Sequence, residues 1–348
     1  MTTPPDAPPL PPALLVVADV DDRQEVSVPG WVRGTPPPPT GRAPDADAPT
    51  GRQAFADFVR RLAADHPELR VTGLLATDGR AALESAVTGL VDQGVRRVVT
   101  VPLTLAGTAA RLGGEDGEAQ RLAHAALRSQ ARTAPGFRYV CRPALGPHPA
   151  LLRLLERRLD QVLGGTGRSL RERAQTTVLL VGRGSADPDE NAEVFRAARL
   201  LWEGRGFAGV ETAFVSLTGP DVPTGLDRCL RLGARRVVVL PYELLDGRHS
   251  ERTRLQAEGW AAAHPDADVR CAGSMGLGEE VAQAVLATYR AALAGGLAEG
   301  RPPEVFTPGP AEAPHPVAPR SGGGAGAHPG AEAPVPVAED GGSFFPGS

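Results

Sequence analysis

Two stretches of the chain, GVRRVVTVPLTLAG at residues 94–107 and GARRVVVLPYELLD at residues 233–246, are variants of one pattern. In each, a glycine and an arginine pair precede a short run of valine and leucine that reaches a proline. The apolar run is continuous rather than alternating, which is typical of a strand buried on both faces of a parallel sheet. The match predicts that the chain contains the same structural unit twice.

The repeat extends outward from these two strands. Upstream, VTGLLA from Val71 matches VETAFV from Val210, and downstream ALGPHPALLRLL from Ala144 matches SMGLGEEVAQAV from Ser274. In the second half, apolar runs alternate with amphipathic stretches: runs at 176–181, 210–215, 236–241 and 268–273, and stretches at 191–203, 222–232, 251–263 and 279–292. Such alternation indicates a doubly wound α/β layer. We therefore predict two tandem lobes, each a four-stranded parallel sheet with helices on both faces.

Three segments rich in proline, glycine and alanine fall outside this pattern. Residues 1–12 and 298–348 lack the branched and aromatic side chains whose burial offsets the entropy of chain ordering, so we predict disordered tails. Residues 24–52 include a run of prolines at 36–39, which fits neither a helix nor a sheet interior and predicts a surface insertion. The lobes are then expected at residues 13–165 and 176–297.

Composition limits the classes of partner. The formal net charge is −4, whereas nucleic-acid-binding proteins usually present a basic face. The cysteines, Cys141, Cys229 and Cys271, lie far apart, which indicates a reduced protein without a disulfide framework or a cysteine metal cluster. No apolar run reaches the roughly 18 residues of a membrane span, and no secretion signal is recognisable. We expect a cytoplasmic protein with no nucleic-acid or membrane partner.

The loop after the first strand of the second half, GRGSADPDEN at residues 182–191, is the first candidate site. Ligands of doubly wound sheets bind beyond the carboxyl ends of the strands. Asp187 and Pro188 are typical of a helix start and need no ligand to explain them. Capping does not explain Arg183 and Ser185, which we predict to face a ligand.

At this loop the chain resembles a known family. GRGSADPDENAEV, followed by GVETAFVSLTGPDVPTGLDRCLRLGARRVVVLPYELLDGRH, is similar to the sirohydrochlorin chelatases, and specifically to the long, two-lobed cobaltochelatase form of cobalamin biosynthesis. The resemblance is strong over about residues 176–290 and weaker over 70–160. It implies flavodoxin-like lobes that insert a divalent metal, Co2+ or Fe2+, into a tetrapyrrole held between them, without an organic cofactor.

The resemblance also implies where metal-site residues should lie. The family usually has a histidine after the first strand, a glutamate after the second, and a histidine in a G-x-H loop after the third. The first two positions are occupied here by Arg183 and Ser216 in the second half and by Asp19 and Thr77 in the first. The third-strand position keeps His249 in the second half, where the first half has Ala109 and Ala110. The resemblance thus implies His249 as the catalytic and metal-binding residue, with Glu243 and Glu251 as further possible ligands.

A sirohydrochlorin-like partner carries several carboxylates, and bidentate pairing with arginine suits them. Four arginines fall on or beside the candidate loops: Arg183, Arg248, Arg252 and Arg254. The predicted tetrapyrrole-binding set consists of Arg183, Ser185, Arg248 and Arg252. Arg236, at the opposite end of its strand, is interpreted as structural. We interpret the acidic run 19–22 as a solvated turn, His148 as part of a helix start and His124 as an ordinary helix residue.

Two functions from different classes remain open. One is an active cobalt- or iron-inserting chelatase that uses His249. The other is a non-catalytic paralogue that binds a tetrapyrrole or a metal, or that partners an active chelatase. The missing first-lobe histidines favour the second function, whereas the loops kept in the second half favour a retained ligand.

Overall fold

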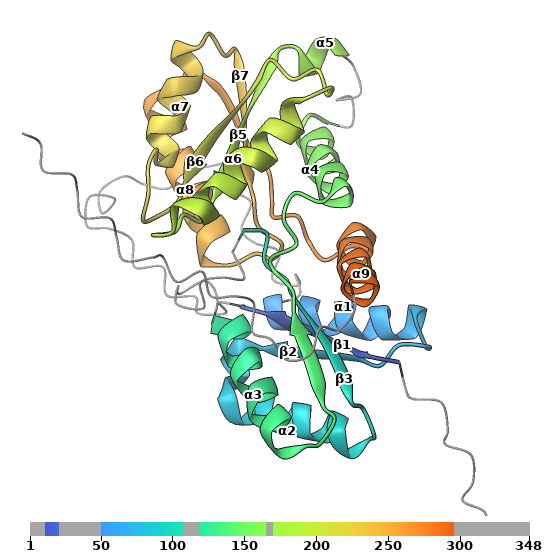
Figure 1. The fold of residues 1–348 in the computed structure, drawn as a ribbon. Helices are drawn as coiled ribbons and strands as arrows, with labels where there is room; N and C mark the ends of the chain where they lie inside the picture. Colours follow the sequence, from blue (N-terminus) through green and yellow to red (C-terminus); the bar gives the residue numbers. More distant parts are fainter. Residues whose placement is uncertain (1–10, 21–49, 107–117, 165–169, 296–348) are drawn as a thin grey trace, which may run out of the picture. The chain divides into compact units, whose positions relative to one another are not determined.

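The computed structural model describes residues 11–20, 50–106, 118–164 and 170–295, which contain two four-stranded parallel sheets (Figure 1). The first has the order β2-β1-β3-β4, and the second has the equivalent order β6-β5-β7-β8. The first-sheet strands are β1 (Ala13–Ala18), β2 (Val71–Leu75), β3 (Arg97–Pro102) and β4 (Arg138–Cys141). Those of the second sheet are β5 (Thr176–Gly182), β6 (Gly209–Phe214), β7 (Arg236–Pro241) and β8 (Asp268–Cys271). The predicted pair of parallel α/β units is confirmed.

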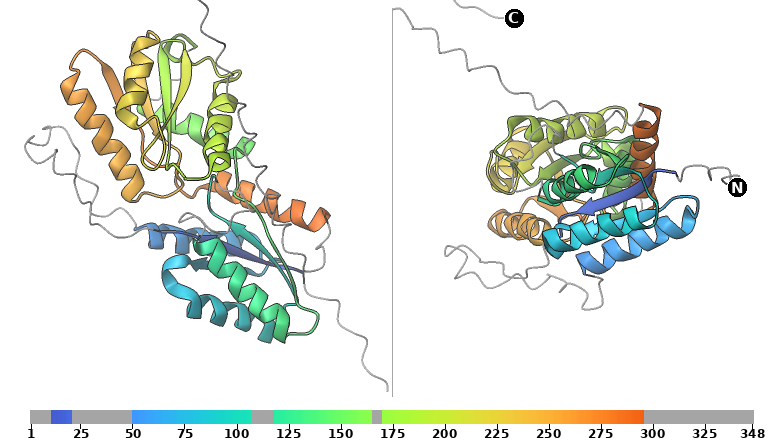
Figure 2. Two further views of the ribbon diagram at one scale, coloured as in Figure 1. Left: turned by 60° about the vertical axis from the view of Figure 1, so that its left-hand side comes forward. Right: turned by 60° about the horizontal axis from the view of Figure 1, so that its bottom comes forward.

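Helices cover both faces of each sheet (Figure 2), which explains why the central strands are buried along their whole length. On one face of the first sheet lie α2 (Gly79–Asp92) and α3 (Glu118–Thr133), and α1 (Gly51–Asp65) lies on the other. A short 3-10 turn, Ala76–Asp78, precedes α2. On the second sheet, α7 (Val222–Arg231) and α8 (Arg248–Ala263) cover one face and α6 (Pro188–Trp202) the other.

The last helix of each repeat is exchanged between the two sheets. Helix α4 (Pro149–Val162) follows β4 in the chain but packs against β7 and α6, and α9 (Glu279–Ala294) follows β8 but packs against β3. The two helices also pack against each other. The hydroxyl of Tyr289 in α9 donates a hydrogen bond to the Pro12 carbonyl at 2.6 Å, at the start of β1. Each half of the sequence therefore contributes one helix to the other half's sheet.

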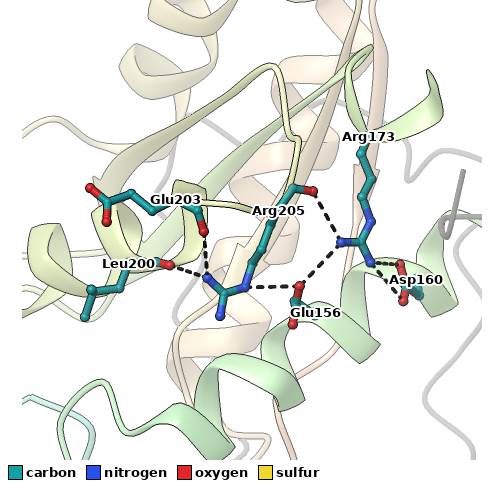
Figure 3. A network of polar contacts seen from close by, with 6 residues as sticks. All are labelled: Glu156, Asp160, Arg173, Leu200, Glu203 and Arg205. Carbon is teal, nitrogen blue, oxygen red and sulfur yellow. Dashed lines mark hydrogen bonds and ion pairs between the residues drawn. The ribbon is translucent and has the colours of Figure 1, made fainter. Parts of the chain in front are cut away.

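Apolar burial and a polar network both hold α4 in place. Its leucine face is buried, at about 1.5–3 kcal/mol for each large side chain. On its other side, Arg173 of α5 (Leu170–Arg173) and Arg205 bind two carboxylates of α4 (Figure 3). Arg173 Nη2 lies 3.1 Å from Asp160 Oδ1, and Arg205 Nε lies 3.1 Å from Glu156 Oε1. These side chains are between 15% and 24% exposed, so solvent screens them less than it would a surface pair.

Some boundaries differ from expectation. Helix α6 begins at Pro188, where Asp187 and Pro188 indicated a helix start, although the apolar pattern alone begins at Asn191. Helix α8 begins at Arg248, before the Glu251 start that the apolar pattern predicted, because the first turn of a helix lies outside its apolar stripe. Several predicted segments lie outside the described residues: 1–10 and 298–348 of the predicted tails, most of the predicted 24–52 insertion and the Ala109–Ala110 position. Pro12, at the end of the predicted N-terminal tail, is described and is buried beside β1. No described helix has the length and apolar character that crossing a bilayer requires.

Candidate functional site

The candidate site lies at the carboxyl ends of β5, β6 and β7. The Tyr242 N–H donates to the Val181 carbonyl at 2.8 Å, and the Val215 N–H donates to the Gly182 carbonyl at 3.0 Å. The three loops therefore leave neighbouring strands side by side. Arg183 follows the central strand β5, and Glu243 and His249 follow β7 at its flank. This placement at one sheet edge agrees with the position predicted for a ligand.

The backbone of Arg183 is fixed against the loop after β6. Both the N–H and the hydroxyl of Ser216 donate to the Arg183 carbonyl, each at 3.1 Å. The next residue, Gly184, has a φ of +89°, and a Cβ placed there would lie 1.9 Å from the Ser216 carbonyl oxygen. Only glycine allows this approach. Ser216, at the position of the family's glutamate, thus orients the Arg183 backbone.

Ser185 has a local structural task. Its hydroxyl accepts a hydrogen bond from the Asp187 N–H at 3.0 Å, in the turn that leads into α6. Asn191 of α6 accepts from the Ser185 N–H at 2.9 Å and donates to the Ser185 carbonyl at 2.8 Å. Sequence reasoning missed Asn191, because an asparagine in the first turns of a helix gives no signal that it closes back on the loop. The ligand role of Ser185 remains a prediction.

The segment after β7 places His249 in the first turn of α8, rather than in the loop where we expected it. Gly247 is the N-cap residue, and its N–H donates to the Ser250 hydroxyl at 2.9 Å. The His249 carbonyl already accepts a bond within the helix, from the Thr253 hydroxyl at 2.9 Å. His249 is half-buried and Glu243 half-buried ahead of it. A helix holds the backbone of His249 more rigidly than a loop would.

The arginines of α8 separate into two groups. Arg248 and Arg252 are exposed on its first turns, where the helix dipole adds positive potential and favours an anionic ligand. Arg254 instead binds its own helix: its Nε lies 2.9 Å from Glu251 Oε2, and its Nη1 lies 2.7 Å from Glu258 Oε1. Arg254 and Glu251 thus pair with each other on one helix, and a role of either in ligand binding remains a prediction.

Metal ligation has no ready-made cluster in the described ranges, which contain no group of three or more His, Cys, Asp and Glu side chains placed to hold an ion. The cysteine sulfurs are poor candidates. Burial raises the pKa of Cys141, Cys229 and Cys271 to about 12 each, so they remain protonated thiols at neutral pH, whereas metals bind the thiolate.

The other polar residues considered from the sequence have structural partners. His148 is the N-cap of α4, where its Nδ1 accepts from the Ala150 N–H at 3.2 Å, and burial lowers its pKa. His124 lies 3.3 Å from the Tyr139 hydroxyl, and burial lowers its pKa too. Arg236 pairs with Asp268 at 2.6 Å, at the amino ends of β7 and β8. The structural interpretations of these three residues agree with the geometry.

The chain contains a doubly wound layer twice, and the carboxyl ends of the second sheet carry arginines and a histidine. These features define a class of two-lobed α/β proteins with a ligand site at the strand ends. Residues 46–162 and 177–292 match the CbiX family. The chain belongs to the CbiX family.

Individual relatives support this assignment. The chain is 30% identical over 198 residues to a sirohydrochlorin cobaltochelatase of Priestia megaterium, covering 57% of this chain and 61% of the relative. It is 26% identical over 166 residues to a sirohydrochlorin ferrochelatase of the same organism, covering 47% and 57%. The matched part is thus less than two thirds of either relative. SirB from Bacillus subtilis, solved with Fe3+, superposes with a TM-score of 0.60 at 20% identity over 82% of this chain and 98% of SirB, which shows a shared fold.

Proposed function

We propose that the protein binds a sirohydrochlorin-like tetrapyrrole at the carboxyl edge of its second sheet and inserts Co2+ or Fe2+ into it. The observation that carries this proposal is the gathering of Arg183, Arg248 and Arg252 on loops and a helix start that leave adjacent strands. Guanidinium groups pair with carboxylates in a bidentate manner, and the tetrapyrrole's side chains are carboxylates. Family membership supports the same substrate class.

The reaction requires a base and a weak metal ligand. Insertion forms metal–nitrogen bonds to the macrocycle, and the pyrrole N–H protons leave for a base. We assign both tasks to His249 in succession, because the single lone pair of neutral imidazole binds borderline metals and is free to accept one proton once the ion has passed to the macrocycle. The second proton leaves to water. Glu243, on the segment just before α8, is the proposed second ligand. Water and the tetrapyrrole nitrogens complete the coordination in this scheme.

A non-catalytic tetrapyrrole- or metal-binding paralogue is the second candidate. The first half of the chain favours it, since Asp19 stands there where the family usually has a histidine, and Arg183 holds the same position in the second half. A guanidinium stays protonated in proteins and offers no lone pair to a metal or a proton. Under this alternative Arg183, Arg248 and Arg252 still bind a tetrapyrrole, but no metal is inserted into it.

Incubation of the protein with sirohydrochlorin and Co2+ distinguishes the two. For the chelatase, the absorbance change of metal insertion proceeds well above the uncatalysed rate. His249→Ala then lowers kcat by about 100-fold, the contribution typical of a general base. Arg183→Ala chiefly raises the KM for the tetrapyrrole. Tetrapyrrole binding without acceleration identifies the second candidate, and absence of both binding and acceleration overturns both.

Titration with Co2+ alone tests the ligand role of His249. Protons compete with a metal for imidazole as the pH falls towards and below about 6.5. The affinity of the parent for Co2+ is therefore expected to fall between pH 8 and pH 6, and His249→Ala removes that dependence. Arg183→Ala is the control, because a guanidinium does not ligate and its loss should leave Co2+ affinity unchanged. Equal Co2+ binding by the parent and His249→Ala at both pH values contradicts the assignment.

A further inference from the structure

The loop between β8 and α9 is held by a side chain from the first half of the sequence. Arg158, on the exchanged helix α4, donates two hydrogen bonds to the Met275 carbonyl, from Nε at 3.1 Å and from Nη2 at 2.8 Å. Its Nη1 donates to Gln161 at 2.9 Å, so the guanidinium is oriented from its own helix as well. Hydrogen bonds from a charged donor are stronger than neutral ones.

The loop is shaped to admit this guanidinium. Gly276 has a φ of +77°, and a Cβ at that position would lie 2.8 Å from Arg158 Nη2. A side chain there would displace the arginine as well as strain the backbone. Met275 is 1% exposed and packs in the core, so its carbonyl has little freedom to move away.

Met275 and Gly276 connect this arginine to the candidate site. The Met275 N–H donates to the Glu243 carbonyl at 2.8 Å, and the Gly276 N–H donates to the Leu244 carbonyl at 2.8 Å. Glu243 and Leu244 form the segment between β7 and the helix that carries His249. Displacement of the Met275 peptide therefore acts directly on the backbone of Glu243, and through Leu244 on the segment that leads to His249.

The internal repeat shows that this contact is specific to the second half. The first half has the equivalent backbone bond, from the Leu145 N–H to the Thr104 carbonyl at 2.8 Å. The repeat that matches Ala144 with Ser274 places Thr288 of α9 at the position of Arg158. The Thr288 hydroxyl donates to Ala284 within its own helix, at 2.9 Å. Among the described residues, the arginine contact is thus made at the loop of the second half, the half that keeps His249.

We infer that Arg158 is a positioning residue for the metal-inserting site: by holding the Met275 peptide, it fixes the Glu243–His249 segment in the geometry that binds the ion. This inference rests on the proposed function. The first half of the chain, which also reaches this loop through the bond from Arg61 to the Leu277 carbonyl, thereby acts on the second half's site. Residues that support metal ligands typically change metal affinity or activity by 10–100-fold when they are lost.

The test is Arg158→Met in the full chain, which keeps the apolar stem and removes the donors. We expect Co2+ affinity and kcat to fall about tenfold with little change in the KM for sirohydrochlorin. Amide hydrogen exchange across residues 242–249 should quicken. Arg153→Met is the matched control, since Arg153 lies on the same helix and bonds Gln283 of α9 at 3.0 Å without contacting the loop. The control should leave all three measurements near the parent's values.

A second variant covers the case in which Arg158→Met fails to fold. Arg158→Lys keeps one charged donor and should give intermediate Co2+ affinity and intermediate exchange. Unchanged affinity and unchanged exchange in a folded Arg158 variant overturn the positioning role. A parent that neither binds nor metallates sirohydrochlorin overturns the proposed function instead, and the exchange measurement with the protein alone still reports whether Arg158 holds the segment.

Discussion

Gly184 joins two candidate loops because its missing side chain lets the carbonyl of Ser216 approach its backbone. The sequence indicated this much: a glycine pair around Arg183 marks a sharp turn at a strand end. It did not indicate that the hydroxyls of Ser185 and Ser216 form hydrogen bonds within these loops. Both hydrogen bonds depend on backbone positions that other elements fix. The same limit applies to Arg158, whose partner is more than 100 positions away in the chain. Residue types were enough to suggest candidate site residues. Their positions in the fold are needed to separate side chains that face a ligand from side chains that hold the loops in place.

A pair of glycine substitutions measures this close approach. Gly184 and Gly233 have nearly the same φ, +89° and +88°, but no atom lies within 4 Å of a Cβ built on Gly233. Gly233→Ala is expected to cost about 1–2 kcal/mol of unfolding free energy, from the left-handed backbone alone. Gly184→Ala adds a steric clash and is expected to cost about 3 kcal/mol or more. Denaturant titration of both variants measures the difference in unfolding free energy. Equal losses of unfolding free energy would mean that the loops of Gly184 and Ser216 move apart without cost.

Helices and strands were predictable as elements, but the partner of α4 was not. Buried valine-rich runs gave the strands, and β7 spans the predicted residues 236–241. His148, interpreted as part of a helix start, is the N-cap of α4, which begins at Pro149. Its leucine stripe, however, fits the face of either sheet, and nothing local records which sheet it covers. Tertiary packing decides which sheet each helix covers. The hydrophobic periodicity of a single segment predicts that a helix forms, but not which sheet it packs against.

The N-cap of α4 makes stability depend on pH. Burial, and then the charge of Arg153, lower the pKa of His148 in the folded protein, and burial, then Arg128, lower that of His124. A lowered histidine pKa means that the unfolded chain binds more protons than the folded one. Stability is therefore fully present above the unfolded value of about 6.5 and falls as the pH drops below it. Thermal melts between pH 7.5 and pH 5 should show this loss. His148→Asn, which keeps a capping oxygen without a titrating group, should reduce it; an unaltered pH dependence in that variant contradicts the contribution of His148.

The ion-pair network on α4 should matter more than pairs at the surface. Arg205→Met removes one of the two arginines that contact Glu156, leaving Arg173 at 3.4 Å, and it removes the donor to the Glu203 carbonyl. This change is expected to cost about 1–3 kcal/mol of unfolding free energy. Arg199→Met removes an exposed pair with Glu203, on the same part of the fold, and is expected to cost less than about 0.5 kcal/mol. Urea unfolding of both variants provides the comparison. Similar losses would show that the network is no stronger than its surface neighbour.

At the scale of the whole molecule, the unit of sequence and the unit of packing differ. The repeat divides the chain near residues 165–175, but α4 completes the second sheet and α9 the first. A piece comprising residues 176–295 retains all the strands of the second sheet and lacks the helix that covers β7. A piece comprising residues 146–277 retains that helix and ends before α9.

These two pieces give opposite expectations. Residues 176–295 should melt at a lower temperature and associate, because the leucine-lined face against α6 and β7 is exposed to water. Residues 146–277 should remain monomeric with a higher melting temperature. Size-exclusion chromatography and thermal melts of both pieces measure this. A stable, monomeric 176–295 piece would show that α4 contributes little to the second sheet.

The bond from Tyr289 to Pro12 spans 277 positions of the chain, which has a consequence for synthesis. A ribosome that adds about 5–20 residues per second delivers α9 on the order of 10–60 s after the strand it completes. During that interval the second sheet already has its exchanged helix, since α4 is made before β5. The N-terminal sheet, although made first, is the last to be finished, and in the nascent chain it is the part that most needs chaperone protection.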